Sequence, residues 1–163
     1  MSDNSPHPMK GYAVDYGWPK HPDHLHVGSY SESVDAAIER SLHERYLFKV
    51  ASELHHRMSC AGGFTWKSNS ETPTAGYVVS DGRRELKLRT VTVESIYRYL
   101  LAHWDHVMAM DNRFFGCWID GDFTYLDVSE IYGWRDQAVR VARERHEKAV
   151  YSLHERKSIP TEE

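Results

Sequence analysis

The fold is decided by one stretch of sequence, FFGCWIDGDFTYLDV, which covers residues 114–128. Two runs rich in aromatic and β-branched residues, 114–119 and 123–128, flank the tripeptide Asp-Gly-Asp. An Asp-Gly step tolerates the positive φ angles of a tight turn, so the pattern predicts an antiparallel hairpin. If residues 121 and 122 form the centre of the turn, Trp118 lies beside Tyr125. If residues 120 and 121 form the centre of the turn instead, Trp118 lies across from Phe123. Both registers place an aromatic pair on the face opposite to Cys117.

The segments on either side of the hairpin predict a mixed α+β fold. Tyr77–Ser80 has the composition of a strand, and Thr92 can cap a helix whose apolar residues recur on one side. A second helix from about Trp134 to Lys148 and a strand over 149–153 complete the order β-α-β-β-α-β, which is that of the ferredoxin-like arrangement. We therefore expect a ferredoxin-like module over residues 62–157 and a tail over residues 158–163. Such a module has both helices on one face of its sheet, and the other face must be covered.

The N-terminal part predicts an additional α/β segment. Residues 1–28 read as an irregular, proline-rich arm with short strands at 12–16 and 25–28. Residues 29–60 then begin with the spacing of a capping box at Ser29–Glu32, followed by a helical apolar stripe up to Leu42. The run Tyr46–Val50 is ambiguous by periodicity, and we favour a strand there over one continuous helix. This N-terminal half is the expected cover for the free face of the sheet.

Composition excludes several classes of protein. The chain has 163 residues, a mean hydropathy of -0.64 and no long apolar run, so we expect no membrane span. Acidic residues outnumber Lys and Arg by 24 to 20, which gives a net charge of -4 and argues against nucleic-acid binding. The two cysteines, Cys60 and Cys117, lack the density of a disulfide scaffold. We interpret this as a chain that works in a reducing, cytoplasmic setting with inert thiols.

Histidine is abundant, with 11 residues, and its densest cluster is His21, His24 and His26. These residue types suit zinc, but no accompanying Cys-x-x-Cys or His-Glu-x-x-His pattern supports a metal site, so exposed imidazoles are the favoured interpretation. The element beginning at His26 also has a weak likeness to the His-x-Gly/Thr motif by which ADP-ribosyltransferases hold NAD. The glycine patterns of nucleotide-binding loops do not occur. We expect no cofactor, with zinc or NAD as the alternatives.

From Gly62 onward, several motifs support a resemblance. They are Gly63-Phe64-Thr65-Trp66, Pro73-Thr74-Ala75-Gly76-Tyr77-Val78-Val79, Gly116-Cys117-Trp118-Ile119-Asp120, Tyr125-Leu126-Asp127-Val128-Ser129 and Ala149-Val150-Tyr151-Ser152-Leu153. In these, the chain resembles a family of proteins from actinobacteriophages and their hosts. The resemblance implies a phage origin. It implies no particular activity, because the family has no established one.

These observations favour a non-catalytic, phage-type protein-interaction module, either a virion component or an early protein that binds a host factor. The aromatic pair of the hairpin is expected either to be buried under the N-terminal half or, as the sharper hypothesis, to bind a partner through Trp118, Tyr125 and Phe123. The partner would be another protein chain, self or host, in the host cytoplasm or the virion. The enzymatic alternative is a metal-assisted or NAD-using transferase centred on His26.

Overall fold

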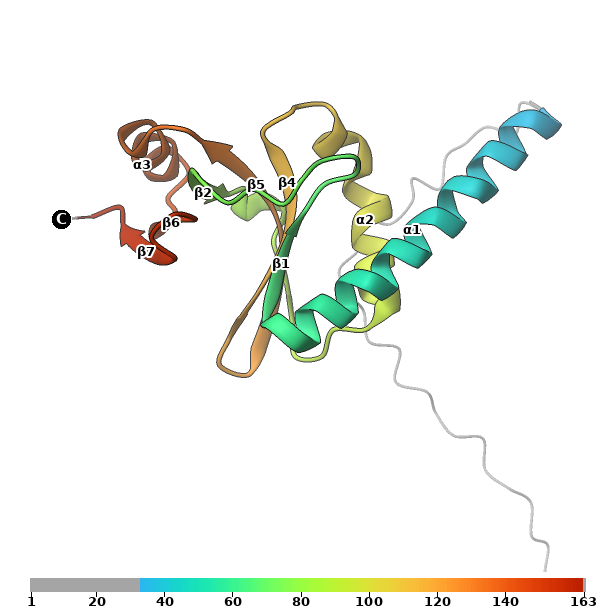
Figure 1. The fold of residues 1–163 in the computed structure, drawn as a ribbon, viewed down its shortest axis with the longest axis horizontal. Helices are drawn as coiled ribbons and strands as arrows, with labels where there is room; N and C mark the ends of the chain where they lie inside the picture. The colour runs from blue at the N-terminus through green and yellow to red at the C-terminus, as the bar shows by residue number, and fades with distance from the viewer. Residues whose placement is uncertain (1–32, 163) are drawn as a thin grey trace, which may run out of the picture. The chain divides into compact units, whose positions relative to one another are not determined.

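The computed structural model describes residues 33–162, and within them the chain is a mixed α+β protein with three α-helices and a seven-stranded antiparallel sheet (Figure 1). The expectations for the arm 1–28 and for the capping box at 29–32 lie outside the described residues. In chain order the elements are α1 (Val34–Ala61), β1 (Gly63–Trp66), β2 (Tyr77–Ser80), the short 3-10 helix η1 (Gly82–Arg84), β3 (Leu86–Leu88), α2 (Val93–Met108), β4 (Arg113–Asp120), β5 (Phe123–Tyr132), α3 (Arg135–Glu144), β6 (Ala149–Ser152) and β7 (Lys157–Pro160).

The predicted hairpin is confirmed as β4 and β5, which are the longest strands of the sheet. Asp120 pairs with Phe123, so residues 121 and 122 form the turn, with Gly121 at a φ of 55°. This is the first of the two predicted registers, and it pairs Trp118 with Tyr125. The remaining strands extend the hairpin on both sides to give the order β1-β4-β5-β2-β6-β7, and β3 pairs with β5 beside β2.

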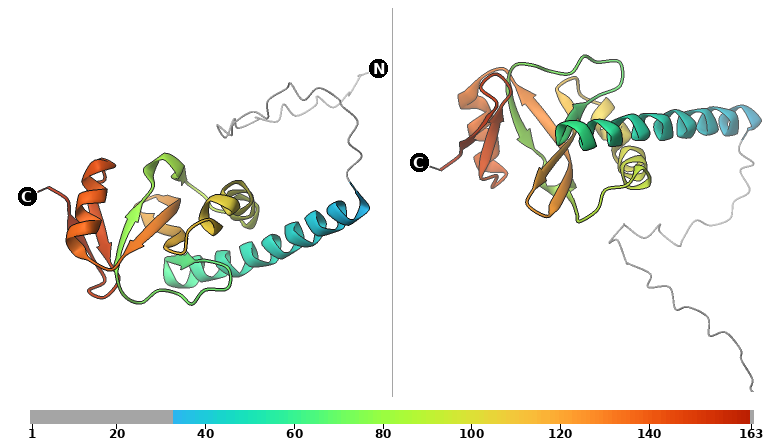
Figure 2. Two further views of the ribbon diagram at one scale, coloured as in Figure 1. Left: turned by 90° about the horizontal axis from the view of Figure 1, so that it is seen from above. Right: turned by 60° about the horizontal axis from the view of Figure 1, so that its bottom comes forward.

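All three helices pack on the same face of the twisted sheet. Directly paired residues point to the same side of a sheet, and so do residues two apart on one strand, such as Val128 and Glu130. Phe115 pairs with Val128 and is buried with α1 and α2. Val79 pairs with Glu130 and is buried with α3, so all three helices lie on one face. Figure 2 shows α3 at one end of the sheet and α1 and α2 at the other. The opposite face, here called the helix-free face, carries Trp118 and Tyr125. The described part of the N-terminal half therefore does not cover the aromatic pair as expected, because α1 joins α2 on the helical face.

The predicted strand at Tyr46–Val50 is wrong, because residues 34–61 form one continuous helix. The buried residues of its second half are Leu47, Val50, Ala51, Leu54 and Met58. Apart from the adjacent pair Val50 and Ala51, they follow one another at steps of three or four residues, the spacing of one helix face against a core. The ambiguity arose because the exposed apolar residues of the first half, such as Leu42, lie on a different side of the same helix.

The sheet has more strands than the four expected. The short strands β1 and β3 add to the hairpin, and β7 occupies part of the predicted tail, where Ile159 is buried against α3. Strands of three or four residues give a weak alternation signal, and their position depends on pairing with residues far away in the sequence. None of the helices described between residues 33 and 162 is long and apolar enough to cross a membrane.

The continuous α1 leads to a test of its second half. Leu54 is fully buried between α2 and the sheet, so Leu54→Ala should lower the free energy of unfolding by about 3 kcal/mol. Leu101→Ala, which truncates an exposed leucine of α2, should change it by less than about 0.5 kcal/mol. Urea denaturation measures both; equal effects would mean that α1 does not pack as described.

Candidate functional site

The most distinctive surface feature is an aromatic stack on the helix-free face. The rings of Trp118 and Tyr125 lie parallel, with centroids 4.1 Å apart and an interplanar angle of 7°. Their pairing across β4 and β5 brings the two side chains to the same point of the sheet. Trp118 nevertheless remains 41% exposed. The structure thus brings together two of the three residues predicted to bind a partner and leaves the larger one accessible.

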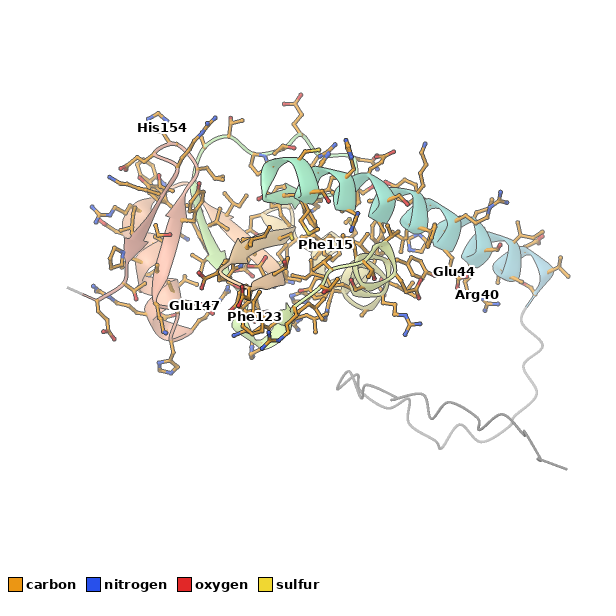
Figure 3. The ribbon with its side chains drawn as sticks, turned by 90° about the horizontal axis from the view of Figure 1, so that it is seen from below. Arg40, Glu44, Phe115, Phe123, Glu147 and His154 are labelled. Atoms are coloured by element: carbon orange, nitrogen blue, oxygen red, sulfur yellow. The ribbon has the colours of Figure 1, made fainter. Side chains whose placement is uncertain are left out.

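The third predicted residue, Phe123, lies beside the stack under two cationic side chains. Lys87 pairs with Tyr125 through β3 and places its Nζ 4.0 Å from the centre of the Phe123 ring and 5.4 Å from that of Tyr125. The guanidinium of Arg89 lies 5.0 Å from the Phe123 centroid. Figure 3 shows Phe123 apart from Phe115, which belongs to the core under α1 and α2. The face therefore combines flat apolar rings with positive charge, a pairing favoured by the ring quadrupole. Lys87 and Arg89 were not predicted as site residues from the sequence, because β3 was not predicted.

A buried carboxylate lies on the same face, two residues from Tyr125. Asp127 is only 4% exposed, and its Oδ2 accepts a hydrogen bond of 3.1 Å from the Ser129 hydroxyl. Its Oδ1 has no hydrogen-bond partner among the described residues. Burial raises the pKa of this carboxyl to about 6, against the hydrogen bonds that lower it. Gly116 lies opposite it, and a Cβ there would lie 2.0 Å from Oδ1, so a larger residue at this position would displace the carboxylate.

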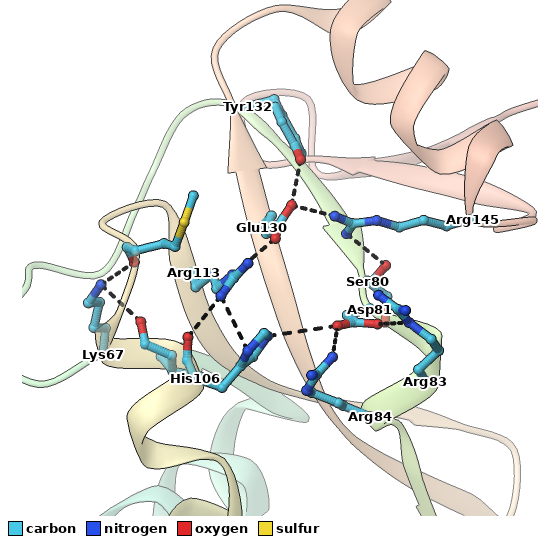
Figure 4. Close-up of polar contacts among 12 residues, drawn as sticks. Lys67, Ser80, Asp81, Arg83, Arg84, His106, Arg113, Glu130, Tyr132 and Arg145 are labelled. Atoms are coloured by element: carbon cyan, nitrogen blue, oxygen red, sulfur yellow. Dashed lines mark hydrogen bonds and ion pairs between the residues drawn. The ribbon is translucent and has the colours of Figure 1, made fainter.

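A second set of charges lies on the helical face and connects its two apolar clusters (Figure 4). Glu130 accepts hydrogen bonds from Arg113 on β4 at 3.0 Å, from Arg145 after α3 at 2.5 Å, and from the Tyr132 hydroxyl at 2.5 Å. Burial alone would raise the pKa of Glu130, but these bonds outweigh it and lower the pKa to about 2. The carboxylate therefore holds β4, β5 and α3 together as a permanent anion near neutral pH.

The network continues from Arg113 to the end of β2. His106 of α2 lies 3.3 Å from Arg113 through its Nδ1 and 3.8 Å from the Asp81 carboxylate through its Nε2. Arg84 and Arg83 also pair with Asp81. Burial, followed by the charges of Arg113 and Arg84, lowers the pKa of His106, so the ring is an uncharged link near neutral pH. The network fixes η1 and α2 to the sheet.

Lys67 supports the same end of α2. Its buried ammonium donates to the carbonyls of Val107 and Met110, at 3.3 and 2.6 Å. Carbonyls at a helix C-terminus have no intrahelical donor and carry partial negative charge, so a lysine there is stabilising. This contact, like the Glu130 network, is a structural use of charge.

The remaining reactive residues are the cysteines and the predicted metal-ligating histidines. Burial raises the pKa of the Cys117 thiol to about 12, which fits the predicted inert thiol. Cys60 is exposed, with its Sγ 3.7 Å from Nε2 of His56. The predicted zinc ligands His21, His24 and His26, and the NAD element at His26, lie outside the described residues. Between residues 33 and 162, no cluster of three or more His, Cys, Asp or Glu side chains could hold a metal ion.

Comparisons with protein-family models, curated proteins and solved structures give no match to this chain.

The Glu130 network can be tested with a matched pair of substitutions. Glu130→Gln keeps the shape of the side chain but removes the charge between Arg113 and Arg145, and should lower the free energy of unfolding by about 3 kcal/mol. Glu94→Gln removes the exposed pair with Arg98 and should cost less than about 1 kcal/mol. Because the pKa of Glu130 is lowered, its contribution is complete above about pH 4.5 and is lost as the pH falls towards 2. Denaturation curves that are equal for the two variants at pH 7 would contradict this assignment.

Asp127 should have the opposite effect on pH dependence. Its pKa is about 6 in the folded chain and about 4 when unfolded, so the folded state binds the proton more tightly. The stability from this group is complete below about pH 4 and decreases by about 3 kcal/mol as the pH rises to 6. Between pH 4 and pH 7, the free energy of unfolding of Asp127→Asn should therefore rise by about that much relative to that of the original chain. Urea denaturation measures this difference. Asp122→Asn, in the exposed turn, is the control, and parallel curves for Asp127→Asn and the original chain would exclude the effect.

Proposed function

We propose that this chain is a non-catalytic protein-interaction module whose contact surface is the helix-free face around Trp118, Tyr125 and Phe123. One observation carries the proposal: a stacked Trp–Tyr pair that is 41% exposed at Trp118, on a sheet face that none of the three described α-helices covers. Large aromatic side chains contribute most of the binding energy at protein interfaces, and pre-stacked rings lose little conformational entropy on binding.

The scaffold of the module is proposed to be ferredoxin-like. The supporting feature is the antiparallel strand order β4-β5-β2-β6. In this order one strand lies between β2 and β4, which stand on either side of α2 in the sequence. One strand also lies between β5 and β6, which stand on either side of α3. This is the order that a split β-α-β unit requires. Strands β1 and β7 would then be additions at the two edges of the sheet, and β3 an addition beside β2.

The chemistry of the face favours a protein partner with an apolar or aromatic side chain next to carboxylates. The rings offer a flat apolar surface, and Lys87 and Arg89 provide the positive charge at its border. A nucleic-acid partner would need cations that follow a phosphate backbone. Here the hairpin turn next to the rings carries Asp120 and Asp122, and the chain as a whole is acidic.

The resemblance to actinobacteriophage proteins supports two settings for this contact. In the first, the module is a virion component and its partner is another copy or another virion protein. In the second, it is an early protein in the host cytoplasm that binds a host factor. The genes beside the coding sequence distinguish the two, since virion genes and early genes form separate groups.

Photo-crosslinking tests the contact surface. Replacing Phe123 by p-benzoylphenylalanine keeps an aromatic ring in place, and the crosslinker should capture a discrete partner in infected or host cells. The same group at the exposed Leu101 of α2 is the matched control and should not capture it. Adding Trp118→Ala and Tyr125→Ala should abolish the product while unfolding stays cooperative, with a loss of about 1–2 kcal/mol from the stack.

Three outcomes would contradict the proposal. If the double alanine variant unfolds, the rings belong to the core. If it retains the crosslinked product, the contact lies elsewhere. If zinc, manganese or NAD at a hundredfold excess over its dissociation constant stabilises the chain by about 2.7 kcal/mol, and this effect disappears on replacement of His21, His24 and His26 by alanine, the enzymatic alternative gains support.

A further inference from the structure

The first half of α1 carries a second apolar surface, separate from the sheet. Val34, Ile38 and Leu42 follow one another at four-residue steps and are between 52% and 74% exposed. This group is here called the α1 stripe. Figure 3 shows the beginning of α1, around Arg40, extending beyond the sheet and α2. An apolar row of three turns on an extended helix usually marks a surface that is covered in the working assembly.

The direction of the α1 stripe shows that it does not belong to the core described between residues 33 and 162. Successive helical residues are rotated by about 100°, so Ile38 and Leu54, sixteen residues apart, point about 160° away from each other. Leu54 points into the core formed with α2 and the sheet. The α1 stripe therefore faces away from that core, and the helix has two apolar sides, of which the described core buries one.

The charges around the α1 stripe are ordered along the helix. Asp35 and Glu39 lie beside its first half, whereas Arg45 and Lys49 lie on its continuation towards the second half, and all four are exposed. No ion pair within residues 33–162 involves Asp35 or Arg45. In a parallel pair of such helices, acid would meet acid and base would meet base. In an antiparallel pair, the acids of one helix meet the bases of the other.

We propose that the α1 stripe binds a second copy of this chain, in an antiparallel pair of α1 helices related by a two-fold axis between Ile38 and Leu42. In this arrangement Ile38 of each copy packs against Leu42 of the other, and Asp35 meets Arg45 twice. The surface is complementary to itself, which is what a two-fold interface requires. A three-turn contact is small, so the dimer is weak, with a dissociation constant on the order of 10–100 µM. This inference does not depend on the proposed function of the helix-free face.

Sedimentation equilibrium of the full chain over a wide concentration range tests the dimer. The original chain should show a monomer–dimer equilibrium, and Ile38→Glu/Leu42→Glu should be monomeric throughout. Asp35→Lys/Glu39→Lys and Arg45→Glu/Lys49→Glu each place like charges opposite one another, and should weaken the dimer by about tenfold or more. The chain that carries all four charge reversals should recover the original dissociation constant within about threefold.

The controls separate the dimer from other occupants of the α1 stripe. Glu53→Lys/Glu94→Lys changes the net charge as much as Asp35→Lys/Glu39→Lys does, but away from the α1 stripe, and should leave the dimer unchanged. A chain that is monomeric at all concentrations overturns the proposal. If in addition Ile38→Glu/Leu42→Glu lowers the melting temperature of the monomer, the stripe is covered within the chain. If the chain dimerises but the fourfold reversal does not restore affinity, the antiparallel pairing is wrong.

Discussion

The hairpin of β4 and β5 is the constraint on which the rest of the structure depends. Because side chains alternate along a strand, the turn at residues 121 and 122 fixes at once which residues enter the core and which form the helix-free face. A shift by one residue would send Phe115 and Leu126 outward and Trp118 and Tyr125 inward. The same register places Glu130 on the helical face and Asp127 on the helix-free face. The core, the charge network and the proposed contact surface are therefore three consequences of one turn.

Two buried carboxylates on the same strand illustrate how position decides chemistry. Glu130 meets two guanidinium groups and a phenol, so its charge is stabilised and its pKa falls to about 2. Asp127 meets one hydroxyl and the backbone of Gly116, so burial dominates and its pKa rises to about 6. The two groups point to opposite faces of the sheet, so they do not act on each other as an acid–base pair. Glu130 connects β4, β5 and α3, whereas Asp127 bonds only to Ser129 of its own strand.

The parts of the fold that were predictable from the sequence are those set by local signals. The Asp-Gly turn gave the hairpin, and the cap at Thr92 with its apolar stripe gave α2, because both signals lie within a few residues. The first half of α1 was predicted and the second half was assigned to a strand, because the apolar stripe changes sides between Leu42 and Leu47. The short strands β3 and β7 depend on distant partners, so Lys87 and Arg89 could not be placed beside Phe123.

Of the candidate site, the three aromatic residues were predicted and the cations were not. Glu130 had a detectable signal, since it follows Leu126 and Val128 at even spacing on the core side of its strand, but its partners Arg113 and Arg145 come from other elements.

The change of side along α1 has a consequence for how the two proposed surfaces act together. The second half of the helix is held by the core, and the first half continues the same helix beyond it. An antiparallel pair formed by two such extensions would keep the two modules at the outer ends of the helix pair, because each core binds the end of α1 that is distant from the two-fold axis. The helix-free faces would then remain accessible in the dimer, since the α1 stripe and the aromatic stack share no residue. Pairing of this kind would present two copies of the aromatic face at once, and a partner with two matching sites would bind with an effective concentration set by the helix pair.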